Sequence, residues 1–330
     1  MKNFAPRLLQ LVALVFVLCA CASDRSVIAQ AADAHRELEP AVVEEAELAA
    51  YLQEVGMRVV AAADSMTKAG YGGESRRDAD SRWMFSDDLR FHLVASDELN
   101  AFTTGGEHMY VYTQLLASCR SEDELAAVVA HEYAHVYGRH VHKGMDRHHA
   151  VLGGALAAAV VGHELAEEDK EEWAVVGGTL ALHAGQFLAL GFTRDDEAEA
   201  DRLGFDFHAR AGWDPARFGD FFQSLVDQGL DTPDDTFSDH PTLRSRVAAA
   251  KVRAAKLPDA AASWRRPPVA DDKRFAALKE KAAACVARQP AGAALQVAQT
   301  LLASVPSCVA ARDSDGQVEA RARLRAAAAR

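Results

Sequence analysis

The chain has 330 residues and a formal net charge of −12 at pH 7. Lys2 and Arg7 are the only charges in the first 20 residues, so the remainder carries −14. An acidic chain without a basic cluster around aromatic residues is not expected to bind nucleic acid or to be drawn to an anionic membrane surface. Its length is sufficient to bury a full core in one large domain or two smaller ones.

The first 20 residues have the pattern of a secretory signal peptide. Their apolar stretch, residues 8–20, is shorter than the roughly 20 residues that span a bilayer. Residues 18–21 read Leu-Cys-Ala-Cys and resemble a bacterial lipoprotein box, with cleavage before Cys21 and lipid on its sulfur. By resemblance to Gram-negative lipoproteins, the absence of Asp after Cys21 predicts an outer-membrane anchor facing the periplasm. An ordinary secretory signal, cut near Ala20 or Ala22, is the alternative.

The region before residue 121 is predicted to contain a helix, a loop and strands. An amphipathic helix is expected over about residues 44–63. Residues 64–81, rich in Gly, Ser and Asp, are expected to form the loop to the first strand. Residues 109–112 read Met-Tyr-Val-Tyr, which is β-prone.

The next helix carries the most informative motif. Ser121 and Glu124 have the pattern of a capping box, and an apolar stripe follows at Leu125, Val128, Val129 and Val136. His131 and His135 are one turn apart on the same face, so two imidazoles can bind one ion. Glu132 lies about 100° around the helix, where it can take a proton from an attacking water. The pattern predicts a zinc hydrolase site; the alternative is a helix with two surface histidines and a solvated glutamate.

A catalytic zinc usually takes three protein ligands, so a third is expected elsewhere in the chain. Residues 192–203 read as the start of a helix, with Thr193 as a plausible N-cap. Glu197 and Asp201 share a face, whereas Glu199 lies about 200° away from Glu197. The spacing favours Glu197 as the third ligand and Asp201 as the group that fixes the second nitrogen of a zinc-bound histidine. An acidic solvated helix is the alternative.

The His-Glu-x-x-His motif, followed 62 residues later by Glu-x-x-Ala-Asp, resembles the HtpX and CAAX-prenyl-protease-type zinc metallopeptidases, metallopeptidase family forty-eight. The lipoprotein box resembles the periplasmic branch of that family. The resemblance implies a gluzincin, with Glu197 as the third ligand of one zinc ion. It also implies an α+β, predominantly helical fold with a small edge β-sheet and a C-terminal helical appendage.

Further motifs follow in the family's order over about residues 45–255. The segments over residues 100–102, 105–106, 109–112 and 115–116 resemble the family's edge strand. An extended substrate would add to that strand near residues 100–112 through backbone hydrogen bonds. The predicted substrate-strand residues are Asn100, Ala101 and Phe102. Residues 192–194 precede the third ligand as in the family, and His240-Pro241, with Arg246 beyond, resembles its downstream His-Pro element.

His240 has two predicted functional roles. It would stabilise the tetrahedral oxyanion, as a catalytic residue, or bind the zinc as a fourth ligand that holds the enzyme latent. A capping or core histidine before Pro241 is the third interpretation. Four more histidines follow the motif and are interpreted as a basic helix end, not as a second metal site: His140, His142, His148 and His149.

The remaining cysteines and two apolar stretches also lead to predictions. Cys285 and Cys308 are predicted to form a disulfide in an oxidising periplasm, whereas Cys119 is predicted to be a small buried residue. Residues 151–162 are too few to cross a bilayer. Residues 174–193 are long enough but are interrupted by polar residues and glycines, so we expect a helix that covers the active site.

The predicted organisation is a signal peptide over residues 1–20, a zinc metallopeptidase domain over 21–255 and a helical segment over 256–330. The predicted function is a lipid-anchored periplasmic zinc endopeptidase that cleaves unfolded or misassembled envelope and outer-membrane proteins. A zinc-stabilised chaperone or assembly factor, with a latent site capped by His240, is the alternative. A helical scaffold without metal is the third hypothesis.

Overall fold

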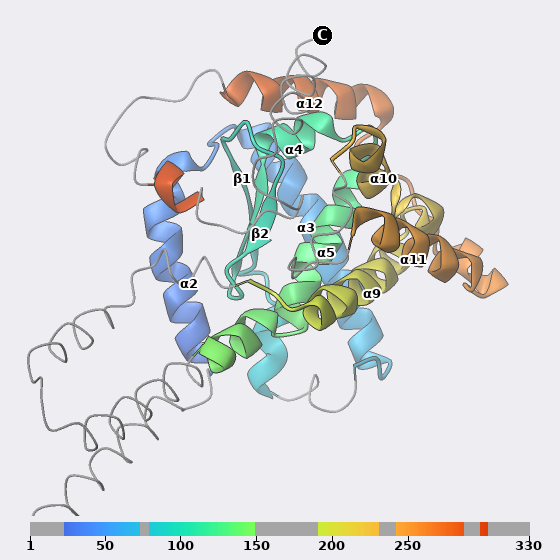
Figure 1. Cartoon of the computed structure of the whole chain (residues 1–330), viewed down its shortest axis with the longest axis horizontal. Coiled ribbons are helices and arrows are strands. Elements are labelled where there is room, and N and C mark those ends of the chain that lie inside the picture. The colour runs from blue at the N-terminus through green and yellow to red at the C-terminus, as the bar shows by residue number, and fades with distance from the viewer. Residues whose placement is uncertain (1–22, 73–78, 149–190, 231–241, 287–297, 303–330) are drawn as a thin grey trace, which may run out of the picture.

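The computed structural model describes residues 23–72, 79–148, 191–230, 242–286 and 298–302. They form helices around one three-stranded sheet and one main hydrophobic core (Figure 1). The longer helices are α2 Asp24–Leu38, α3 Ala46–Lys68, α4 Thr113–Ser118, α5 Glu122–Tyr137, α9 Arg194–Ala211, α10 Asp220–Asp227, α11 Leu243–Ala255 and α12 Asp272–Val286. Short 3-10 helices are η1 Glu39–Ala41, η3 Ala79–Phe85, η4 Pro215–Arg217 and η5 Asp259–Trp264. No helix within these ranges combines the length and apolar character needed to cross a bilayer.

The sheet has the order β1-β3-β2, with β1 Arg90–Val94, β2 Ala101–Thr103 and β3 His108–Tyr112. β1 pairs with β3 in parallel, and β2 pairs with β3 antiparallel. The segment predicted to form the edge strand, about residues 100–112, contains two strands. β2, which holds Ala101 and Phe102, lies at one end of the strand order, whereas residues 109–112 form the centre of the sheet, as their burial on both faces requires.

Helix α3 is longer than expected. It begins at Ala46 and continues to Lys68, so the first five residues of the predicted loop are helical. Lys68 Nζ lies 2.6 Å from Asp64 Oδ2, an i,i+4 ion pair that suits the last turn of a helix. α3 packs against β1, α5 and α9. In Figure 1, α2 covers one side of the sheet while α3 and α5 lie on the other.

Helix α5 begins without the predicted capping box. The Ser121 side chain makes no capping hydrogen bond. The Glu124 carboxylate instead accepts the Arg120 backbone N–H at 2.7 Å and the Arg120 Nε–H at 2.7 Å. In a capping box, Glu124 would accept the backbone N–H of Ser121. Here the same carboxylate is satisfied by Arg120, the residue before the N-cap.

The buried Glu122 joins the start of α5 to the segment beyond residue 255. Its carboxylate accepts four hydrogen bonds, from Tyr51 Oη, Trp213 Nε1 and the backbone N–H groups of Val269 and Ala270. α12 then packs on α3 and α4. The described part of this segment is mostly helical, as predicted, and shares the main core.

Candidate metal centre

Two packed helices bring a pair of histidines four residues apart together with a carboxylate that lies 62 or more residues later in the chain. His131 and His135 project from α5, and Glu197 projects from the first turns of α9. The helices approach closely at this point, because a Cβ on Gly204 would lie 3.0 Å from the His131 Cα. Glycine therefore allows α9 to place its acidic face against the histidine face of α5.

The three groups have the spacing of metal ligands. His131 Nε2 lies 3.1 Å from His135 Nε2 and 3.4 Å from Glu197 Oε2, and His135 Nε2 lies 3.7 Å from Glu197 Oε1. Donor atoms on a tetrahedral zinc, each about 2.0–2.2 Å from the ion, are about 3.3 Å from one another. Two imidazoles and one carboxylate, all buried, thus fit one divalent ion.

Asp201 and Arg246 support the first histidine. His131 Nδ1 lies 3.1 Å from Asp201 Oδ1, and Arg246 bonds that carboxylate through Nε and through an amino group at 2.7 Å. The Arg246 guanidinium also stacks 3.8 Å from the Phe222 ring centroid. Asp201 lies next to the second nitrogen of His131, where the sequence predicted it. The ion pair between Arg246 and Asp201 instead depends on the packing of α11 against α9.

The charges of the site favour a cation. Burial and the Arg246 charge act to lower the pKa of His131, but the Asp201 and Glu197 carboxylates outweigh them and raise it to about 9. Burial holds the pKa of His135 well below its usual value. The negative charge that would retain a proton on one imidazole is equally suited to hold a metal ion between the two.

His140 supports the second histidine. Its Nδ1 lies 2.9 Å from His135 Nδ1, and its Nε2 lies 3.2 Å from Glu199 Oε2, which also accepts from Lys143 Nζ at 3.0 Å. With His135 Nε2 facing the ligand cluster, its Nδ1–H donates to His140 Nδ1, and the His140 Nε2–H donates to Glu199. The tautomer of His135 is thereby fixed.

The interpretation of these histidines as a basic helix end is wrong for two of them. His140 and His142 are buried, and His142 Nε2 lies 2.9 Å from Asp24 Oδ1 in α2. The helix is interrupted after α5 by a turn at Gly138 and Arg139, where Arg139 has a φ of 54°, and helix resumes at His140. Gly138 makes room for the His140 ring, since a Cβ there would lie 2.3 Å from His140 Nε2.

The start of α9 completes the site. Thr193 is the N-cap, as predicted, and forms a capping box with Asp196. Phe192 stacks on the His135 ring with centroids 3.8 Å apart. The segment before the third ligand therefore both begins the helix and covers one face of a ligand histidine.

Glu132 is buried next to the ligand cluster. It is 5% exposed, and this burial, together with the Glu197 charge, raises the pKa of its carboxyl to about 7. A carboxyl group with such a pKa exchanges protons readily near neutral pH. Its place one residue after His131 puts it beside the three ligands and not among them.

The predicted substrate residues lie in or next to β2, which packs against α5, and several other predicted residues lie outside the described ranges. Ala101 and Phe102 are in β2, and Asn100 precedes them, its carbonyl accepting the Tyr112 N–H at 3.0 Å. Cys119 is buried, as predicted. Cys285 is a half-buried residue of α12, and its pairing stays a prediction. The predicted residues outside the described ranges are Cys21, His149, His240 and Cys308, together with the apolar stretches over 151–162 and 174–190.

A buried His-Glu-x-x-His helix, joined to a carboxylate from a second helix, defines the class of metal-dependent hydrolases whose third ligand is a glutamate. The model of peptidase family M48 matches residues 76–254, more than half of the chain. The chain belongs to peptidase family M48 and is a metallopeptidase.

The chain is also similar to individual proteases. The chain is 32% identical over 171 residues to the beta-barrel assembly-enhancing protease of Yersinia pestis, covering 51% of this chain and 35% of that protein. The protein of that name in Escherichia coli K12 is 29% identical over 216 residues, 64% of this chain and 39% of the relative. Metalloprotease LoiP of E. coli K12 is 26% identical over 159 residues, 48% and 60% respectively. The chain thus spans well under half of the length of the two assembly-enhancing proteases.

Proposed function

We propose that this chain is a zinc-dependent endopeptidase in which Glu132 activates the attacking water. One observation carries the proposal: His131, His135 and Glu197 offer ligand atoms within 4.8 Å of one another at a buried position. Imidazole nitrogen and carboxylate oxygen are the ligands of catalytic zinc sites with two histidines and one glutamate.

The mechanism assigns one task to each group. Zinc bound to the three ligands would supply a Lewis acid that polarises the scissile carbonyl. Glu132 takes a proton from a water molecule while the water oxygen attacks the carbonyl carbon. It then delivers that proton to the leaving amine nitrogen as the C–N bond breaks. Asp201 and His140 keep the two imidazoles in the tautomers that leave their Nε2 lone pairs free.

The substrate is proposed to be an extended polypeptide that pairs with β2. This strand lies at one end of the strand order, and no further strand pairs with it within the described ranges. Backbone pairing selects unfolded segments more than particular sequences. The relatives named beta-barrel assembly-enhancing protease support unfolded or misassembled outer-membrane proteins as the natural substrates. A lipid on Cys21 is the proposed anchor, placing the enzyme in the periplasm at the outer membrane.

The substitution Glu132→Gln tests the proposed base. The variant is expected to keep one zinc per catalytic site, measured by inductively coupled plasma mass spectrometry, and to lose cleavage of denatured casein by about 10²–10⁴-fold. Glu280→Gln changes an exposed carboxylate of α12 and is the matched control. Casein cleavage by Glu132→Gln at the wild-type rate would remove Glu132 as the base.

The same assay separates a working protease from a latent one. If His240 caps the metal, His240→Ala should cleave casein while the wild type does not. If His240 stabilises the oxyanion, the substitution should lower the rate. Proteins trapped by Glu132→Gln in cell envelopes, identified by mass spectrometry, would define the substrates.

A further inference from the structure

A second cluster of histidines lies on the side of the sheet that α2 covers. His92 in β1 pairs in register with Tyr110 of β3, and His108 lies two residues before Tyr110. Side chains two residues apart on a strand share a face, so His92 and His108 lie side by side. His35 projects from the last turn of α2 towards the same face.

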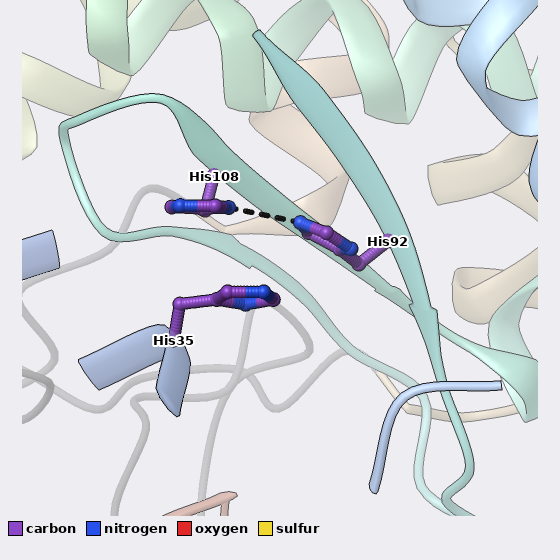
Figure 2. Close-up of side chains that lie close together, drawn as sticks. All are labelled: His35, His92 and His108. Atoms are coloured by element: carbon purple, nitrogen blue, oxygen red, sulfur yellow. Dashed lines mark hydrogen bonds between the residues drawn. The ribbon is translucent and has the colours of Figure 1, made fainter. Parts of the chain in front are cut away.

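The three rings are in direct contact (Figure 2). His35 stacks on His108 with centroids 4.0 Å apart and on His92 with centroids 4.4 Å apart. His92 Nε2 and His108 Nδ1 are hydrogen-bonded at 2.9 Å. One ring nitrogen from each residue lies within 4.8 Å of the other two.

We propose that His35, His92 and His108 form a second metal site, which binds a divalent transition ion of the Zn²⁺ class and ties α2 to the sheet. A set of three imidazoles suits zinc, copper and nickel, whereas magnesium and calcium prefer oxygen ligands. The site shares no residue with the cluster on α5 and α9, so it is independent of the proposed peptidase mechanism.

Metal binding would require the stacked rings to rotate, because the lone pair of an imidazole nitrogen lies in the plane of its ring. Donor nitrogens on one zinc are about 3.3 Å apart. The ring nitrogens of the three histidines lie within 4.8 Å of one another, so each separation must shorten by at most about 1.5 Å. Rotation about the Cβ–Cγ bond of histidine has a broad, shallow energy profile, so each ring can turn its lone pair towards a common point at little cost. Tyr110 Oη bonds His35 Nδ1 at 3.0 Å, which directs Nε2 of that ring to the ion.

The three histidines are half-buried where α2 meets the sheet. The nearby charges are mixed: Glu39 favours a cation near His35, and Arg90 opposes one near the strands. Arg90 is itself bonded to the loop carbonyl of Leu89 at 3.0 Å.

The experiment uses the full chain carrying His131→Ala and His135→Ala, so that the α5–α9 site is removed and the second cluster is intact. After treatment with a chelator and dialysis, the protein is titrated with Zn²⁺ in a calorimeter. We expect one equivalent to bind, and His92→Gln, His108→Gln or His35→Gln, each added to that background, to abolish it. His142→Gln is the matched control, because it removes a buried histidine that also contacts α2 and is expected to leave the one equivalent intact.

Thermal unfolding gives a second measurement that does not require stable strand variants. Zn²⁺ should raise the Tm of the background protein and should not raise that of its His35→Gln derivative, whose change lies on the covering helix. Failure of the background protein to bind Zn²⁺ would overturn the proposal. So would one equivalent that persists in all three cluster variants, because the ion would then lie elsewhere.

Discussion

Two clusters of three metal-ligand side chains occur in the described part of this protein, and they are assembled in different ways. In the first, two ligands are four residues apart on α5, and one comes from α9. In the second, each ligand comes from a different element: α2, β1 and β3. The first therefore leaves a local sequence motif, and the second leaves none.

The clusters also differ in what surrounds them. Both histidines of the α5–α9 cluster have a bonded partner behind them, Asp201 for His131 and His140 for His135. Within the described ranges, the α2–sheet cluster has one bond from Tyr110 to His35 and one bond between His92 and His108. Orientation by a second layer of hydrogen bonds is typical of catalytic metal sites. The comparison indicates chemistry at the first cluster and a structural role at the second.

The sharpest test of this division is the removal of both α5 ligands. His131→Ala with His135→Ala should lower casein cleavage by about 10³-fold or more, because the stabilisation supplied by a bound zinc is several kcal/mol. Zinc content should fall from two equivalents to one. A fall to none would mean that the α2–sheet cluster does not hold an ion.

The support behind His131 should have the next largest effect. Asp201→Asn removes the charge that faces the buried Arg246, so we expect a loss of about 3 kcal/mol in the free energy of unfolding and about 10–100-fold in zinc affinity. Urea unfolding and zinc titration measure the two quantities. Asp195→Asn, an exposed change on the same helix, is the control. Equal behaviour of the two variants would show that the carboxylate of Asp201 has no special role.

His140 is expected to act as a positioning residue. His140→Phe keeps a ring in the same place but removes the bonds to His135 and Glu199, and we expect about tenfold weaker zinc binding. The readout is competition with a zinc-binding dye. His148→Phe, on the same helical stretch over residues 140–148, is the matched control. Unchanged affinity in His140→Phe would contradict a supporting layer behind His135.

Acid should destabilise the helix pair through His208, which lies on α9 away from the ligands. Burial lowers its pKa to about 4 against the charges of Asp123 and Asp214, with Arg265 acting in the same direction as burial. Its Nε2–H donates to the Asp123 carbonyl at 3.2 Å, and its buried Nδ1 has no partner within the described ranges.

The sign of this effect follows from the two protonation states. The unfolded chain takes up a proton near pH 6.5 while the folded protein does not until about pH 4, so stability falls as the pH drops between these values. Between pH 7 and pH 5 the loss from His208 is about 2 kcal/mol. Urea unfolding with a chelator present should show a smaller pH dependence in His208→Phe, which keeps the contact with Trp213. An unchanged slope would assign the acid sensitivity to other groups.

The smallest effect on catalysis is expected from the α2–sheet cluster. His108→Phe keeps the stacked ring and removes one proposed ligand. Casein cleavage per folded molecule should stay within about twofold of wild type, since a change away from the reacting groups alters no interaction made in the transition state. A rate loss comparable to that of the α5 variants would show that the clusters work together.

Much of the first cluster could be predicted from the residues. The i,i+4 spacing of His131 and His135 fixes their common face, and the capping pattern at Thr193 fixes the orientation of Glu197 and Asp201 on α9. His140 could not be predicted in this way, because its approach depends on the turn at Arg139. The central place of β3 depends on strand pairing, which the β-prone sequence does not specify.

By itself the sequence determined which side chains share a helical face: two imidazoles on one helix and two carboxylates on another. The order of these motifs along the chain also indicated the family. Tertiary structure alone decided that Arg246 bonds Asp201, that Glu122 joins four distant donors, and that histidines from a helix and two strands meet. The physical reason is that backbone geometry repeats within a few residues. Contacts between elements instead depend on how whole faces pack.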